Sequence, residues 1–148
     1  AADYPAALLA LGATIKTNTR SLSAEDFFTG LFETALDEGE MVTAVEFTAP
    51  EKSGYSKFRN PASRYAMTGV FVCKHGDGSV GVGVAGAGSD GAFRSSEMET
   101  ALAGDFTSAA LETISIDSSD LMSDMHASAE YRANLIKVMG KRAVQQAE

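Results

Sequence analysis

The residues best suited to nucleophilic or metal chemistry are a single cysteine and two histidines. Cys73 follows the apolar run Val70–Val72, which predicts a reduced thiol that fills the core. His75 falls in a predicted hairpin turn and His126 precedes the predicted last helix, so neither has a convincing setting as a general base. These three side chains also cannot supply a zinc or iron–sulfur ligand set. The sequence therefore predicts no self-contained catalytic or metal site.

Two further patterns could serve a cofactor. Gly81, Gly83 and Gly86 have the Gly-x-Gly-x-x-Gly spacing of a dinucleotide loop, but they alternate with small apolar residues and no helix is expected before about Ser95. A strand packed closely against helices is the favoured interpretation. Lys57 lies in the middle of a predicted strand between aromatic residues, where a lysine that protects an edge strand is the ordinary explanation.

The elements that must position these residues indicate an α+β fold. Apolar runs with β-type patterns predict an antiparallel β-meander, with a hairpin around the turn His75–Gly78. Helical periodicity then predicts a three-helix C-terminal layer packed on the sheet, with a capping box at Ser96 and Glu99. The predicted strands are Met41–Phe47, Tyr55–Arg59, Thr68–Lys74 and Val80–Ala87, and the predicted helices are Ser96–Ala103, Thr107–Ile114 and Ala127–Gln146.

The segment before the meander carries less apolar mass. It predicts a short helix over Pro5–Leu11, a small hairpin around Asn18, and a helical turn capped by Ser23 with Asp26. This portion cannot close a core alone, so the chain is divided into residues 1–38 and a larger domain over residues 39–148.

Composition limits the classes of partner. The chain has 148 residues, 45% apolar content and a formal charge of −8, which suits one core and disfavours binding to nucleic acid or an anionic membrane surface. No apolar run approaches the roughly 20 residues of a membrane span. The single cysteine fits a cytoplasmic setting, and the absence of an initiator methionine suggests a processed or truncated chain.

Several segments, in collinear order, resemble the FAD-binding medium subunit of the carbon monoxide dehydrogenase/xanthine dehydrogenase (molybdenum hydroxylase) family. They cover essentially the whole chain. The resemblance identifies it with the C-terminal portion of that subunit, in which residues 1–38 are the C-terminal remnant of the FAD-binding domain and residues 39–148 are the CO dehydrogenase flavoprotein C-terminal domain. The matching segments are Ala1–Ala13, Ala24–Gly30, Asp37–Val45, Tyr55–Arg59 with Tyr65–Ala66, and Ser123–Arg132.

The resemblance implies three cofactor-binding positions. Asp3 matches an acidic flavin-binding residue, Val42 an apolar residue at the flavin, and Lys57 a lysine near the flavin ring. It implies FAD in the intact subunit, with molybdopterin on a large subunit and 2Fe-2S clusters on a small subunit. The family's two glycine-rich pyrophosphate loops precede the region matched by Ala1, so this chain alone is expected to hold FAD poorly and to be inactive.

Two alternatives remain open at this stage. The chain could be a non-catalytic module that docks a partner subunit without touching a cofactor. It could also be a small enzyme with a thiol nucleophile at Cys73, although its apolar neighbours oppose the lowered pKa that such a thiol requires.

Overall fold

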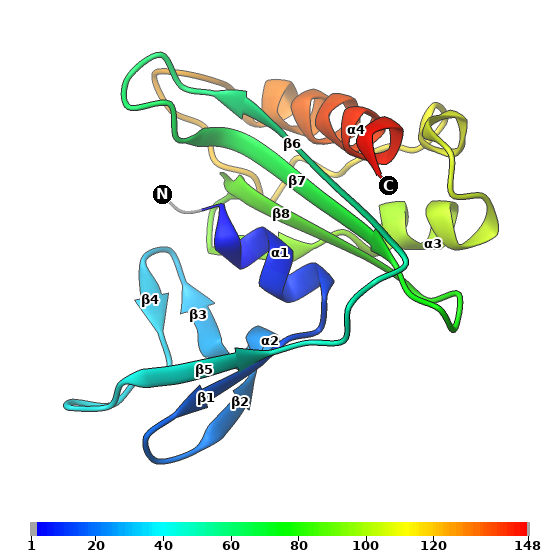
Figure 1. The fold of residues 1–148 in the computed structure, drawn as a ribbon. Helices are drawn as coiled ribbons and strands as arrows, with labels where there is room; N and C mark the ends of the chain where they lie inside the picture. The colour runs from blue at the N-terminus through cyan, green and yellow to red at the C-terminus, as the bar shows by residue number, and fades with distance from the viewer. Residues whose placement is uncertain (1–2, 148) are drawn as a thin grey trace.

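The computed structural model describes residues 3–147 and consists of two antiparallel sheets, a short hairpin and helices on both faces of the larger sheet (Figure 1). Ala1, Ala2 and Glu148 belong to predicted segments but lie outside the described residues. The elements in chain order are α1 (Tyr4–Ala10), β1 (Thr14–Thr17), β2 (Ser21–Ser23), α2 (Ala24–Phe27), β3 (Phe28–Gly30), β4 (Glu33–Thr34), β5 (Val42–Glu46), β6 (Lys52–Arg59), β7 (Ala66–Lys74), β8 (Val80–Gly88), β9 (Gly91–Arg94), α3 (Ser96–Gly104), the 3-10 helix η1 (Ser108–Leu111) and α4 (Ala129–Gln146).

The larger sheet is an antiparallel meander in the order β6-β7-β8-β9. The predicted hairpin between β7 and β8 is confirmed, with Val70 opposite Val84 and Val72 opposite Val82. Its turn closes through a hydrogen bond from the Gly78 amide to the His75 carbonyl, and Gly78 has a φ of 86°. A positive φ at this position favours glycine because it has no Cβ to clash.

The two faces of this sheet carry different side chains because successive strand residues point to opposite sides. Val70, Val72, Val82 and Val84 are fully buried in the main core, together with residues of α3, η1 and α4. The predicted antiparallel sheet with a C-terminal helical layer is thereby confirmed, although the layer's middle helix is only the short η1.

Helix α1 covers the opposite face, where glycines take the place of side chains (Figure 1). A Cβ built on Gly81 would lie 1.8 Å from the Ala10 carbonyl oxygen, and one built on Gly83 would lie 1.9 Å from the Ala6 carbonyl oxygen. The helix backbone therefore rests directly on β8. The interpretation of the glycine series as a strand packed closely against a helix is confirmed.

The placement of the predicted strand Met41–Phe47 in the meander is wrong. Its strand β5 instead pairs with β1, as Ile15 opposite Val45, in a separate three-stranded sheet of order β2-β1-β5. Alternating polarity predicts a strand but does not choose its partner. The division at residues 38 and 39 stays a proposal, and this pairing favours a boundary after β5.

The predicted capping box at Ser96 and Glu99 is also wrong. Ser95, rather than Ser96, precedes α3, and it makes no side-chain capping bond. The Glu99 carboxylate does not cap but accepts hydrogen bonds from the Val82 amide and from Arg94 Nε, at 2.9 and 2.8 Å. A tertiary contact with β8 thus replaces the local capping box.

Helical spacing in the sequence predicts one shared face of the last helix for Tyr131, Leu135, Val138, Met139 and Arg142, and this prediction is partly wrong. Leu135 and Met139 are buried as expected, but Tyr131 and Arg142 are exposed. Arg132 is buried instead, with only 2% of its surface exposed. A charged residue at this position was not predicted for the core, because its burial depends on acceptors that come from distant segments.

Candidate functional site

Asp3 and Lys57, which the resemblance assigns to the flavin, lie together in the structure. Lys57 Nζ donates a hydrogen bond to Asp3 Oδ2 at 2.6 Å, across 54 residues of sequence. Asp3 directly precedes α1 and Lys57 lies on β6, opposite Gly69 of β7. Both side chains are partly buried, at 40% and 21% exposure, so the pair remains within reach of a ligand.

A cavity of about 340 Å³ adjoins this ion pair and is lined by Asp3, Tyr4, Ala7, Tyr55 and Phe71. Its composition is one carboxylate, two phenol rings, a phenyl ring and a methyl group. Such a mixture of flat apolar surface with few polar groups is typical of small-molecule sites.

Tyr55 contributes the most unusual polar group of the cavity. Its hydroxyl oxygen is inaccessible to solvent and lies beside the Asp3 carboxylate, although it meets no described acceptor with full hydrogen-bond geometry. Burial, and secondarily the neighbouring Asp3 carboxylate, raise the pKa of the Tyr55 phenol. Gly69 makes room for the hydroxyl, since a Cβ there would lie 2.4 Å from it. Sequence reasoning missed this role because it treated Tyr55 only as an apolar neighbour of Lys57.

Val42, the third residue assigned by resemblance, lies elsewhere among the described residues. It belongs to β5 of the smaller sheet, is 38% exposed, and does not line the cavity beside Asp3. The structure therefore brings Asp3 and Lys57 together without Val42.

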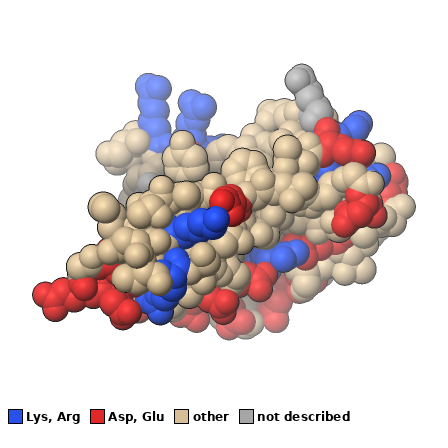
Figure 2. Space-filling model, turned by 60° about the horizontal axis from the view of Figure 1, so that its bottom comes forward, with Lys and Arg blue, Asp and Glu red and all other residues tan. Residues whose placement is uncertain are grey.

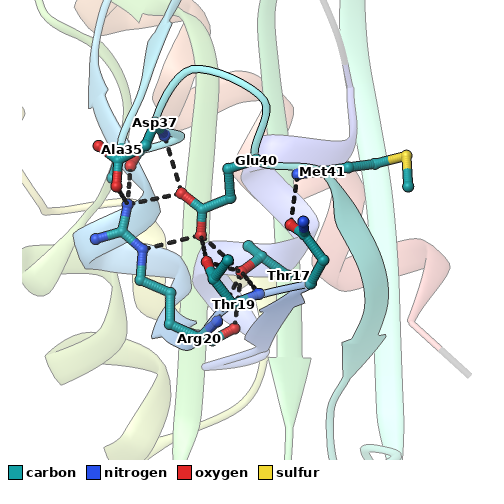
Figure 3. A network of polar contacts seen from close by, with 8 residues as sticks. Thr17, Thr19, Arg20, Ala35, Asp37, Glu40 and Met41 are labelled. Carbon is teal, nitrogen blue, oxygen red and sulfur yellow. Dashed lines mark hydrogen bonds and ion pairs between the residues drawn. The ribbon is translucent and has the colours of Figure 1, made fainter.

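A polar network fastens the loop that leads into β5 (Figure 3). The Glu40 carboxylate accepts two hydrogen bonds from Arg20, at 2.9 and 2.8 Å, and one from the Asp37 amide at 2.9 Å. The hydroxyls of Thr17 and Thr19 donate to the same carboxylate at 2.6 and 2.8 Å. These donors, chiefly Arg20, hold the pKa of Glu40 far below its ordinary value of 4.5.

This network explains how a side chain in a surface loop becomes shielded. The Glu40 side chain is only 2% exposed, whereas Arg20 is 39% exposed. Because Arg20 Nη2 also donates to the Ala35 carbonyl, one guanidinium joins the β1–β2 hairpin to the loop before β5. Sequence reasoning did not single out either residue, and an arginine at the end of a hairpin is not a specific signal.

Of the remaining candidates, Cys73 and His75 lie together, with Cys73 Sγ 3.7 Å from His75 Nε2. The Cys73 thiol is buried and donates to the Ala10 carbonyl at 3.3 Å, and burial raises its pKa. A raised pKa disfavours the reactive thiolate. Among these residues, no group of three or more His, Cys, Asp or Glu side chains is placed to hold a metal ion. None of their helices is long and apolar enough to cross a membrane.

Comparisons with curated proteins agree with the resemblance. A family model described as the FAD binding domain in molybdopterin dehydrogenase matches residues 1–50. The chain is 33% identical, over 97% of its length, to the glyceraldehyde dehydrogenase medium chain of Sulfolobus acidocaldarius. It is 29% identical, over 99% of its length, to the nicotine 6-hydroxylase medium subunit of Paenarthrobacter nicotinovorans. It covers 56% of each relative and so spans about half the length of these proteins.

The fold comparison covers nearly the whole chain. Reconstituted CO dehydrogenase from Oligotropha carboxidovorans matches with a TM-score of 0.77 and 27% identity, over 97% of this chain and 55% of that chain. The match thus extends beyond residues 1–50 into the larger sheet and α4. Together these findings show that residues 1–50 match the FAD binding domain in molybdopterin dehydrogenase, and that nearly the whole chain is similar to about half of the medium subunits named above.

Proposed function

We propose that this chain forms one wall of the FAD site in the medium subunit of a molybdenum/iron–sulfur/FAD oxidoreductase, with Asp3 and Lys57 directed at the cofactor. The proposal includes partner subunits that hold molybdopterin and 2Fe-2S clusters. When bound, FAD would accept electrons from the clusters and pass them to an acceptor. The observation that carries the proposal is the Asp3–Lys57 ion pair beside a cavity with aromatic walls.

The described residues fit this cofactor chemically. The Lys57 ammonium can stabilise negative charge on a neighbouring ring, and the Asp3 carboxylate can accept hydrogen bonds from hydroxyl or amide groups. Val42 is kept in the proposal only as an apolar contact supplied from β5.

Replacing Lys57 with methionine in the complete medium subunit tests the proposal. A charge-assisted hydrogen bond is worth roughly 1.5–3 kcal/mol. Its loss should lower the flavin midpoint potential by about 30–65 mV, since 30 mV corresponds to about 1.4 kcal/mol for a two-electron couple. The measurement is a redox titration of the flavin absorbance.

Lys16→Met provides a matched control for the redox titration, because Lys16 also forms an ion pair, with Glu46 at 2.6 Å, but lies on β1. The control should leave the potential unchanged. A Lys57→Met subunit with the wild-type potential and a lowered melting temperature would remove the cofactor role and leave Lys57 as a structural residue.

We infer that the 148-residue chain by itself binds FAD weakly and is inactive. Its Gly-x-Gly-x-x-Gly series does not offer a free phosphate loop, because Gly81 and Gly83 pair within the sheet and pack against α1. Without a cradle of free backbone amides, the pyrophosphate gains little binding energy. Equilibrium dialysis of the purified chain with FAD should show far less than stoichiometric binding at micromolar concentration, and near-stoichiometric flavin would contradict this inference.

The alternative function is a non-catalytic module that docks a partner subunit without touching a cofactor. The exposed apolar residues around β5 support this alternative. It predicts normal subunit association and no effect of Lys57 on the flavin. The redox titration therefore also separates these two functions.

A further inference from the structure

Gly69 of β7 lies beneath the hydroxyl end of the Tyr55 side chain. In the pairing of β6 with β7, Tyr55 is opposite Phe71 and Lys57 is opposite Gly69, so Tyr55 and Gly69 are diagonal neighbours. Aromatic side chains reach across such a diagonal. A Cβ built on Gly69 would lie 2.4 Å from the Tyr55 hydroxyl oxygen and 3.2 Å from Cζ of the ring. The phenol therefore occupies the space that a side chain at position 69 would fill.

This space lies on the face of the sheet that carries the cavity beside Asp3. Gly69 and Phe71 are two residues apart on β7 and point to the same face. Phe71 and Tyr55 both line the cavity, whereas the Tyr55 hydroxyl oxygen is inaccessible to solvent. The absence of a side chain at Gly69 thus determines where one aromatic wall of the cavity stands.

Gly69 differs in this respect from the glycines of β8. A Cβ on Gly81 or Gly83 would meet a backbone carbonyl oxygen of α1, at 1.8 and 1.9 Å. Backbone atoms inside a packed fold cannot step aside, but the end of a side chain can move if empty space adjoins it. The cavity of about 340 Å³ provides such space next to the Tyr55 ring. A methyl group at position 69 should therefore displace the ring into the cavity without separating the helix from the sheet.

We propose that Gly69 is a positioning residue of the site, because it accommodates the Tyr55 hydroxyl and so holds this aromatic wall away from the space that a ligand occupies. The inference rests on the proposed flavin site for the identity of the ligand. The placement of Tyr55 by Gly69 is a property of this chain alone and can be tested without a cofactor. Gly69 acts through Tyr55 and not through a contact of its own with the ligand.

Acylation of tyrosine hydroxyls by N-acetylimidazole tests the placement in the isolated chain. In the wild type, Tyr55 should stay unmodified because its hydroxyl oxygen is inaccessible, while Tyr4, which is 79% exposed, should react. In Gly69→Ala, Tyr55 should become reactive as its ring moves toward the cavity. Mass spectrometry of the peptides that contain each tyrosine makes the measurement.

Gly104→Ala is the matched control for the acylation, because a Cβ at Gly104 meets nothing within 4 Å. Tyr55 should remain protected in this variant. Protection of Tyr55 in Gly69→Ala would overturn the proposal. Failure of Gly69→Ala to fold would also overturn it, because the displaced ring is expected to find empty space.

The complete medium subunit gives the second readout. Gly69→Ala should raise the FAD dissociation constant about tenfold, because the displaced ring takes up room that the ligand needs. Adding Tyr55→Phe removes the atom that meets the new Cβ at 2.4 Å. The double variant should then bind FAD within about twofold of Tyr55→Phe alone.

An unchanged FAD affinity in Gly69→Ala would contradict the positioning role, as would a loss that Tyr55→Phe does not restore. The acylation experiment contains no flavin. Its result therefore stands whether or not the redox titration of Lys57→Met supports the proposed function, and the two failures can be told apart.

Discussion

Glu40 shows how a single carboxylate can make a loop sensitive to pH. Its folded-state pKa lies far below 4.5, so its network contributes stability above about pH 4.5 that is lost as pH falls toward the folded-state pKa. Glu40→Gln should therefore lower the melting temperature by a few degrees at pH 7, and this deficit should shrink below about pH 4. Thermal melts from pH 7 to pH 3 make the measurement.

The control for the pH series is Glu46→Gln. Glu46 also forms an ion pair, with Lys16 at 2.6 Å, but its side chain is 59% exposed. Exposed pairs contribute little, so this variant should follow the wild type throughout. A Glu40→Gln deficit that stays constant as the pH falls would contradict the assigned role of the carboxylate.

Arg132 is the second residue whose removal should matter. Its guanidinium donates to the Met67 and Gly86 carbonyls at 2.6 and 2.8 Å, and to Asp124 at 2.8 Å. Arg132→Met would remove all three of these hydrogen bonds from a buried site, so the free energy of unfolding should fall by about 3 kcal/mol. Urea denaturation measures this loss. Arg142→Met, an exposed change on the same helix, should stay within about 0.5 kcal/mol of the wild type, and equal effects of the two changes would contradict the prediction.

At the scale of elements, the contact between α1 and β8 predicts a sharp glycine requirement. Gly81→Ala would place a methyl group 1.8 Å from the Ala10 carbonyl oxygen, and the resulting overpacking should cost about 3 kcal/mol. Gly104→Ala, at the end of α3, meets nothing within 4 Å and should be neutral or slightly stabilising. Chemical denaturation of both variants makes the comparison, and equal stabilities would exclude the close approach.

The elements also show what the sequence could predict. Local signals were sufficient for α1, for the β1–β2 hairpin around Asn18, for the Ser23 cap and for the β7–β8 hairpin. The partner of β5 was not predictable in this way, because a strand pattern does not identify the strand that will pair with it. Asp3 and Lys57 came from resemblance. Tyr55 and Arg132 were missed since their environments depend on residues distant in sequence.

For the whole molecule, several exposed large apolar side chains lie in or next to β5 of the smaller sheet. In Figure 2, tan surface is interrupted by basic side chains near the centre of the face, and acidic side chains lie along its lower edge. Exposed apolar residues in or next to β5 include Met41, Val42, Val45 and Phe47, and β5 is an edge strand. Such patches favour association.

The isolated chain should therefore associate at high protein concentration, more strongly as salt screens its formal charge of −8. Phe47→Lys should raise the concentration needed for association about tenfold. Met125→Lys is the control, because Met125 is 93% exposed but lies in the loop before α4. Sedimentation velocity over a concentration series measures both, and an equal response would contradict a specific role for the β5 surface.

The direct backbone contact between α1 and β8 has a mechanical consequence for the Asp3–Lys57 ion pair. Side chains usually form a compliant layer between a helix and a sheet, because rotamer changes absorb small movements. At Gly81 and Gly83 that layer is missing, so backbone meets backbone. A displacement of β8 must then carry α1 with it as a rigid body. Asp3 precedes α1, so its backbone is held by the stiff contact with β8. The distance between Asp3 and Lys57 therefore changes mainly through movement of the lysine side chain.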